Sequence, residues 1–222
     1  AEPNYVFSVN DFTIDSDIIY DKDLKPVNED DLAPLTPNDP LYSDQSNITD
    51  ANIDDVWGEY TTGDGSQIVA ILDTGVDYTH PDLVDNIWEN IAERDGIAGF
   101  DDDGNGYVDD IYGWDFINAD NTPLDDNMHG THVAGIVGAV GGNGKGIAGA
   151  AWNVKLMSIK VFQSNGTGNS TTIAEGVTYS AINGATILNM SFGSYAESQT
   201  LKSALENAYA SSVLVGAAGN NK

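Results

Sequence analysis

The regular alternation of short apolar runs with helix-like segments constrains this chain more than any other feature. A short, predominantly apolar run is typical of a strand buried on both faces, as in a parallel sheet. Such runs lie at residues 67–73, 155–162, 185–192 and 212–218. Segments with helical spacing lie at 129–140, 171–183 and 199–210. Strands that alternate with helices predict an α/β fold of three layers, with a mainly parallel sheet flanked by helices.

The second and third helical segments each carry an apolar face. Apolar residues that recur every three or four positions form one side of a helix. In 171–183 these residues are Ile173, Val177, Ala181 and Ile182, and in 199–210 they are Leu201, Ala204, Leu205 and Ala208. Both helices are therefore expected to pack on the sheet.

Charge is distributed very unevenly along the chain. The net charge is −27, and 32 of the 35 acidic residues lie in positions 1–126, together with only three basic ones. Nucleic acid is excluded as a partner, because phosphate binding needs clustered Lys and Arg. A strongly acidic half points instead to cation binding. Cysteine is absent, so neither disulfides nor thiolates contribute, and a metal ion is one candidate for the stabilising role of a disulfide.

Two regions stand outside the alternation. Residues 1–35 are rich in Asp, Asn and Pro and predict an acidic N-terminal arm, either extended with a short strand near Tyr5-Val6-Phe7 or partly disordered. The remainder, 36–222, is expected to form one domain. Within it, residues 86–128 are dense in Asp, Asn and Gly, and a loop of that length is usually functional or organised by metal.

The sequence contains no segment suited to a membrane. There is no stretch of about 18 uninterrupted apolar residues, so we expect no membrane span. The chain does not open with a basic segment followed by an apolar one, so any export signal was either removed or never present.

Three polar residues stand where a hydrolase site needs them. Asp73 and Asn220 follow apolar runs, and ligands gather at the carboxyl ends of parallel strands. His129 opens a helical segment. An aspartate fixes the tautomer of a histidine, a histidine exchanges a proton near neutral pH, and an Asn amide donates to a developing oxyanion. Taken singly, Asp73 also fits a helix cap or a turn, and Asn220 fits a turn.

His129 and His132 also form a His-x-x-His pair. Such a pair can bind zinc, although a zinc site needs a further ligand at a defined spacing. A metal hydrolase is therefore an alternative function. Otherwise His132 is expected to be a buried structural residue.

Five segments in order resemble the signature motifs of the subtilisin-like serine proteases, or subtilases. They are Ile71-Leu72-Asp73-Thr74-Gly75-Val76-Asp77, His80-Pro81-Asp82-Leu83, His129-Gly130-Thr131-His132-Val133-Ala134-Gly135, Asn189-Met190-Ser191-Phe192-Gly193 and Ala217-Ala218-Gly219-Asn220. They occur in the family's order of Asp, His and oxyanion Asn, with the nucleophilic Ser last. The resemblance runs from about Thr36 to Lys222 and implies a subtilisin-like sheet that is incomplete in this chain.

The resemblance implies a role for each of these positions. Asp73 orients the histidine, His129 is the general base and Asn220 is the oxyanion donor. Two strands clamp an extended peptide by β-augmentation. Their substrate-binding residues are Phe162, Gly166, Thr167 and Gly168 in the first strand and Ser191, Phe192 and Gly193 in the second.

The family's nucleophile belongs to a Gly-Thr-Ser-Met-Ala motif that follows the oxyanion Asn, and this sequence contains no such motif. We therefore expect the serine in missing sequence or in a companion chain, the C-terminal remainder of the protease. The first residues, Ala1-Glu2-Pro3-Asn4-Tyr5, resemble the junction at which the propeptide of a subtilase ends.

Residues 101–110 predict a cation site from their own pattern. Oxygen-bearing side chains alternate at Asp101, Asp103 and Asn105, with Gly106 next, as in the first half of an EF-hand loop. The twelfth position is Tyr112 rather than Glu, so a true EF-hand is excluded. The remaining candidate ligands are Tyr107, Asp109 and Asp110. A solvated acidic turn is the alternative.

The family resemblance implies two further calcium sites of the kind found in thermitase-like members. One gathers Asp115, Asn118, Asp120 and the carbonyl of Thr122. The other joins distant segments through Asp39, Asp82 and Asn143 and the carbonyls of Val140, Lys145 and Ile147. The second site would fasten the region around Asp39 to the core.

These inferences predict a secreted, calcium-stabilised serine endopeptidase that acts on polypeptides by Asp-His-Ser acyl transfer. Its own propeptide, or a peptide inhibitor, is a further candidate partner. The alternative from another class is a calcium-dependent peptide-binding scaffold that keeps the fold without the nucleophile.

Overall fold

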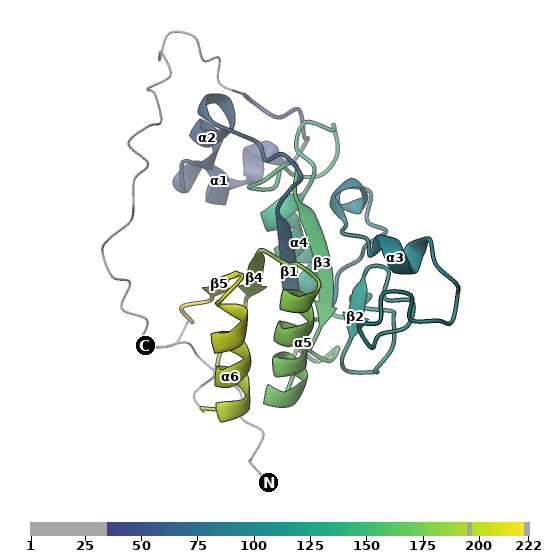
Figure 1. Cartoon of the computed structure of the whole chain (residues 1–222). Helices are drawn as coiled ribbons and strands as arrows, with labels where there is room; N and C mark the ends of the chain where they lie inside the picture. Colours follow the sequence, from purple (N-terminus) through teal and green to yellow (C-terminus); the bar gives the residue numbers. More distant parts are fainter. Residues whose placement is uncertain (1–34, 195–196, 220–222) are drawn as a thin grey trace.

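Five strands, paired in parallel, form the sheet of the computed structural model, which describes residues 35–194 and 197–219 (Figure 1). They are β1 (Ile68–Asp73), β2 (Gly113–Asp115), β3 (Lys155–Lys160), β4 (Ile187–Met190) and β5 (Val213–Gly216), in the spatial order β2-β3-β1-β4-β5. The predicted α/β sheet is confirmed, since each of the four apolar runs contains a strand. The expectation that all four strands are buried was wrong for β5, which lies at the end of the described strand order and whose Val213 and Val215 are 61% and 45% exposed. β2 is an additional strand within the long loop at 86–128, which is called the excursion below.

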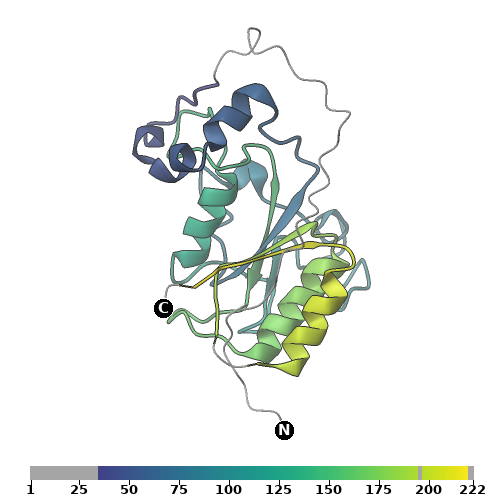
Figure 2. The ribbon, with the colours of Figure 1, turned by 90° about the vertical axis from the view of Figure 1, so that its left-hand side faces the viewer.

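Helices cover both faces of the sheet, as a parallel sheet requires. The helices predicted at 129–140, 171–183 and 199–210 are α4 (His129–Gly138), α5 (Ser170–Ile182) and α6 (Gln199–Ala208). Figure 2 shows α5 and α6 side by side on one face and α4 on the other. The Asn169 side chain caps α5 through the N–H groups of Thr171 and Thr172, and Ser198 caps α6.

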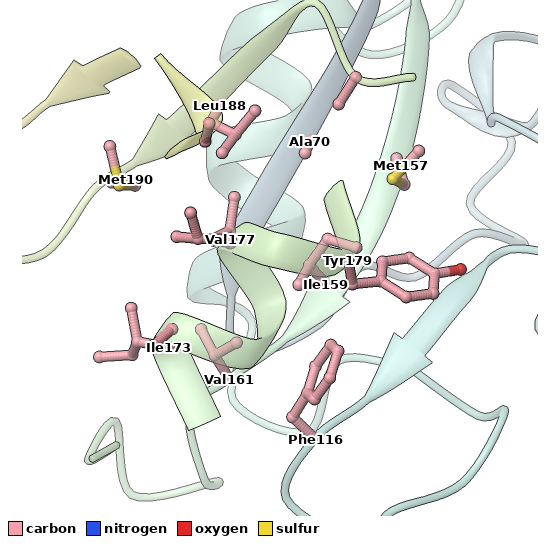
Figure 3. Close-up of a cluster of buried hydrophobic side chains, with 14 of the residues drawn as sticks. Ala70, Phe116, Met157, Ile159, Val161, Ile173, Val177, Tyr179, Leu188 and Met190 are labelled. Carbon is pink, nitrogen blue, oxygen red and sulfur yellow. The ribbon is translucent and has the colours of Figure 1, made fainter. Parts of the chain in front are cut away.

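The core lies on both faces of β1, because successive side chains of a strand point in opposite directions. Ala70 and Leu72 pack toward α5, in a cluster with Ile159 and Val177 (Figure 3). On the opposite face, Val69, Ile71, Leu156 and Ala134 form a second cluster beneath α4. The prediction for the face of α5 needs one correction, because Ile182 at its end is 60% exposed.

Residues 36–66 form a segment that the sequence pattern did not predict as helical. It holds η2 (Tyr42–Asp44), α1 (Ser46–Asp50) and α2 (Ile53–Glu59), which lie beside residues 139–153. The Gln45 side chain exchanges two hydrogen bonds of 2.8 Å with the backbone of Ala148. Trp57 donates to the Ala150 carbonyl and packs against the ring of Trp152. The predicted N-terminal arm, including the strand near Tyr5, lies outside the described residues apart from Leu35.

The excursion at 86–128 is ordered by its own polar side chains. It begins within η3 (Val84–Asn86) and contains α3 (Ile91–Arg94) besides β2. β2 pairs with β3, so the excursion rejoins the sheet at its edge. None of the helices in the described part of the chain is both long and apolar enough to cross a bilayer.

Candidate active site

Asp73 and His129 meet at the carboxyl end of the sheet. Asp73 is the last residue of β1, and His129 is the first residue of α4. His129 Nδ1 lies 2.7 Å from Asp73 Oδ1. The aspartate side chain is 3% exposed and the histidine side chain is 49% exposed. A buried carboxylate thus holds one ring nitrogen while part of the imidazole remains open to a reactant.

The close approach of these two residues depends on glycines beside them. Gly75 turns the chain after β1 with a φ of 102°, which favours glycine. Gly130 follows His129, and a Cβ at that position would lie 2.0 Å from the Gly75 carbonyl oxygen. Only glycine allows α4 to start so close to the end of β1.

Asp125 joins the aspartate loop to the histidine loop. Its Oδ1 accepts hydrogen bonds from the Thr74 hydroxyl and from the N–H groups of Asn127 and Met128. Its Oδ2 accepts from the N–H and the hydroxyl of Thr131. The half-buried carboxylate therefore fixes the residues on both sides of His129 to the residue that follows Asp73.

These contacts make the stability of the fold depend on pH. Burial acts to raise the pKa of Asp125, but hydrogen bonds from Thr131, Asn127 and Thr74 outweigh it and hold the pKa below its ordinary value. A lowered pKa in the folded state stabilises the fold above the unfolded pKa, and this contribution is lost as pH falls through the folded value. We expect Asp125→Asn to lower stability at pH 7 by about 1–3 kcal/mol and to flatten the decline below about pH 4.

Melting temperatures of the complete protein between pH 2 and 7 test this expectation. Asp85→Asn is the control, because Asp85 is exposed and its carboxylate does not join the two loops, so it should leave the pH dependence of the melting temperature unchanged. The expectation would be contradicted if the melting temperatures of the wild type and of Asp125→Asn fell by the same amount between pH 7 and pH 2.

A cleft of roughly 200 Å³ opens beside the Asp73–His129 pair. The residues that line it are Asp73, Thr74, Asn127, His129, Phe162, Gly166, Ser191 and Phe192. The rings of Phe162 and Phe192 meet edge to face, with centroids 4.9 Å apart. Of the predicted substrate-binding residues, the cleft thus brings together Phe162, Gly166, Ser191 and Phe192.

The other predicted substrate-binding residues lie next to the cleft lining. Gly168 forms an antiparallel bridge with Phe162, and Gln163 donates to the Thr167 carbonyl. Gly193 follows Phe192 and is exposed. Asn127 is a lining residue that sequence reasoning missed, and its side chain donates to the Ser164 carbonyl at 2.7 Å. Its position two residues before His129 was the available signal.

Asn220 lies outside the described residues. The chain that leads to it is described as far as Gly219, and Ala217 donates to the Met190 carbonyl at the end of β4. This contact places Ala217 at the same end of the sheet as Asp73.

The prediction for His132 was wrong. His132 lies one turn along α4 from His129 and is exposed rather than buried. Within residues 35–194 and 197–219, the one group of three potential metal-binding side chains consists of carboxylates and contains no histidine. The zinc alternative therefore gains no support from the geometry.

That group of carboxylates is Glu93, Asp101 and Asp103, whose oxygens lie within 4.8 Å of one another. Asp101 and Asp103 were predicted ligands, whereas Glu93 was missed. Glu93 is only 3% exposed and accepts from the N–H groups of Asp102 and Asp103. The absence of a Glu at the twelfth loop position was the available signal for a contribution from another segment.

The remaining predicted ligands of this loop have other contacts. The Asn105 side chain bridges the carboxylates of Asp103 and Asp110. Asp109 accepts from Gly99 N–H, and the ring of Tyr107 packs on Tyr179. Burial raises the pKa of Asp110, against hydrogen bonds from Tyr179, Asn105 and Asn90.

The Asp115 loop is closed by its own side chains. Asp115 is 1% exposed and accepts from the N–H groups of Ile117 and Asn118 and from the Asn118 amide. Asp120 forms a bridge with Asp115, while its carboxylate accepts from Thr122 N–H. The predicted ligands are neighbours, but the Asp115 carboxylate is already occupied by local donors.

The third predicted site brings three distant segments together. Asp39 is 5% exposed, and its Oδ2 accepts from Gly142 N–H, while its buried Oδ1 has no hydrogen-bond partner among the described residues. Asp82 is 2% exposed and accepts from the Asn143 amide and from Ile147 N–H. The carbonyls of Val140 and Lys145 belong to the same loop. A buried carboxylate oxygen without a donor fits a cation.

Comparison with known proteins agrees with the sequence motifs. Residues 64–222 match the model of the subtilase family (Peptidase_S8). A thermophilic serine proteinase of Bacillus sp. (strain AK1) is 35% identical over 222 residues, which are 100% of this chain and 44% of that protein. Thermitase of Thermoactinomyces vulgaris is 36% identical over 187 residues, which are 83% of this chain and 58% of that protein.

The solved structure of sphericase is similar as well. It superposes with a TM-score of 0.56 and 33% sequence identity, covering 77% of this chain and 52% of that one. The chain therefore spans about half the length of the relatives that it matches.

Proposed function

Because the chain belongs to the subtilase family, we propose that it carries the general base, the orienting acid and the oxyanion donor of a serine endopeptidase. His129 is the base, Asp73 the acid and Asn220 the donor. The observation that carries the proposal is the 2.7 Å contact between His129 Nδ1 and the buried Asp73 carboxylate.

The proposed chemistry follows from that contact. Asp73 accepts a hydrogen bond from the Nδ1–H group, so Nε2 carries the lone pair that takes a proton from a serine hydroxyl. The imidazolium that forms is stabilised by the buried carboxylate and later protonates the leaving amine. Asn220 donates its amide N–H to the oxyanion that develops on the scissile carbonyl.

A polypeptide is the proposed substrate. The cleft lies between the segment after β3 and the segment after β4, and its apolar part is formed by Phe162 and Phe192. We propose that a peptide lies there in extended form and adds its backbone to the residues on both sides. A propeptide or a peptide inhibitor, being an extended chain, would occupy the same cleft.

The nucleophilic serine is proposed to come from sequence outside these 222 residues, in continuous chain or in a companion chain. Ser191 is the serine that lines the cleft, but its hydroxyl accepts from the Asn189 amide and it precedes Asn220. In the family's order the nucleophile follows the oxyanion donor.

Calcium is the proposed cofactor, and its role is stability. Asp39, Asp82 and Asn143 would hold one ion, with the carbonyls of Val140, Lys145 and Ile147. Glu93, Asp101 and Asp103 would hold another, and the Asp115 loop is a third candidate. An ion that binds the folded state alone adds stability by mass action. Sites of this kind suit a protein that acts outside the cell, so we also propose secretion.

Labelling of the complete protein with a fluorophosphonate probe tests the function, because the probe reacts with a serine activated by a general base. We expect one labelled serine, in sequence that follows Asn220, and loss of labelling in His129→Ala. His132→Ala is the control and should be labelled normally. Firm peptide binding without any labelling would contradict the proposal and favour a peptide-binding scaffold.

A further inference from the structure

The last residue of β3 is a lysine to which the proposed mechanism gives no role. Lys160 is 1% exposed, although a buried charge is costly unless it is paired and hydrogen-bonded. Its ammonium group has three N–H donors. One donates to the Thr74 carbonyl at 2.7 Å, one to Asp126 Oδ1 at 2.6 Å and one to the Phe162 carbonyl at 3.1 Å.

The three acceptors belong to three separate segments of the candidate active site. Thr74 follows Asp73 and shares in the turn that ends β1. Asp126 lies in the loop that leads into His129. Phe162 lines the cleft. One buried ammonium group therefore joins the acid loop, the base loop and the substrate-binding segment.

The sheet fixes the direction of this side chain. Lys160 stands in register with Asp73 of β1. Residues in register on adjacent parallel strands project to the same face, so the lysine leaves the sheet on the side of the Asp73 carboxylate. The backbone of Lys160 is held by β1 and by β2 on its other side. The ammonium group is thus anchored before it binds its three acceptors.

We propose that Lys160 is a positioning residue, which sets the relative placement of Asp73, His129 and the Phe162 segment through its three hydrogen bonds. The proposal rests on the proposed function. A neutral side chain would leave two buried carbonyls and one carboxylate without their donor, and these loops would relax apart. A displacement of about 1 Å between reacting groups costs about 10² in rate.

The test compares Lys160→Met with Lys155→Met in the complete protein. Lys155 begins the same strand and so lies at the end opposite Lys160. Its ammonium group donates to the Asp85 carbonyl at the surface. We expect Lys160→Met to lower kcat about 10²-fold and to raise KM by a smaller factor, because the Phe162 segment of the cleft also loses its donor. Lys155→Met should leave both constants unchanged.

A second readout does not require activity. The Nδ1 proton of His129, held by Asp73, gives a low-field proton resonance that can be assigned with labelled histidine. Lys160→Met is expected to shift or broaden this resonance, and Lys155→Met is not. Wild-type kcat and an unchanged resonance in folded Lys160→Met would overturn the proposal, whatever its melting temperature.

Two further outcomes remain decisive. If Lys160→Met does not fold, Asp126→Asn takes its place, because the Asp126 side chain is 48% exposed and the substitution removes only the charge of one acceptor. It should produce a smaller fall in kcat and the same change in the resonance, and no change in either would overturn the proposal. If the wild-type protein cleaves no peptide, the proposed function fails, while the resonance still reports whether Lys160 positions the Asp73–His129 pair.

Discussion

Asp73→Asn is expected to lower the kcat of the complete protein about 10⁴-fold, the size of the effect that the same replacement has in a chymotrypsin-like triad and close to that of removing the corresponding acid of subtilisin. The almost fully buried carboxylate lies 2.7 Å from His129 Nδ1 and, in the proposed role, accepts a hydrogen bond from its N–H. An asparagine amide can donate to Nδ1 instead, which would leave the Nε2 proton in place and the base unable to act. The turn should survive, because Asn retains an oxygen that can accept from Thr74 N–H.

Asp77→Asn is the matched control for this substitution. Asp77 lies four residues further along, and its carboxylate accepts local hydrogen bonds from the N–H and the hydroxyl of Thr79. Steady-state hydrolysis of a chromogenic peptide gives kcat for both variants, and titration with a fluorophosphonate gives the concentration of active enzyme. A kcat of Asp73→Asn within tenfold of wild type would show that Asp73 does not orient the base.

Removal of calcium is expected to lower the stability of the complete protein by about 4 kcal/mol when the free ion is at 1,000 times its dissociation constant. For a domain of this size the loss corresponds to roughly 10 °C in melting temperature. The physical reason is that Asp39 and Asp82 are both buried and that Asp39 Oδ1 has no hydrogen-bond donor within the described part of the chain. Excess EDTA should produce the shift, and added calcium should reverse it.

Substitutions assign the shift to a site. Asp39→Asn should remove a large part of the response to EDTA, because it removes one negative charge and leaves the rest of the loop in place. Asp85→Asn is the control, since Asp85 lies three residues from Asp82 but is exposed. A melting temperature that EDTA does not change in the wild-type protein would contradict the calcium proposal at all three loops.

The sheet could be predicted because its signal is strong and local. β1 and β3 are almost entirely buried, and β4 is at least half-buried along its length. These three strands and the largely exposed β5 each fall in a predominantly apolar run of the sequence. β2 could not, since three residues that include Gly113 and Asp115 carry no periodicity. Its place at the edge beside β3 depends on pairing rather than on its own sequence.

The helices α1 and α2 were missed for a related reason. Each is short, and each buries one principal residue, Ile48 or Trp57, among Asp, Asn and Thr. Isolated helices of this length are unstable in water, so their order comes from packing against Trp152 and its neighbours. No window of local sequence contains that information.

The candidate site was predicted as a set of motifs but not as a network. The position of Asp73 and His129 at strand and helix ends could be inferred, because parallel strands end together. The burial of Lys160 could not, since a lysine at a strand end normally extends into solvent. The same limit applies to Glu93, whose contacts with Asp102 and Asp103 join α3 to a loop that begins seven residues after α3 ends.

The docking of η2, α1 and α2 on residues 139–153 has a consequence for folding kinetics. The hydrogen bonds between Gln45 and Ala148, and between Gly142 and Asp39, each join residues 103 positions apart. Contacts of such long range form only after the intervening chain has been brought together, and high contact order slows folding. The segment from Asp39 to Trp57 therefore adds to a framework that β1, β3 and α4 must first provide. A cation bound by Asp39 and Asp82 would act on that last step, because it would stabilise the docked segment after the rest of the domain has formed.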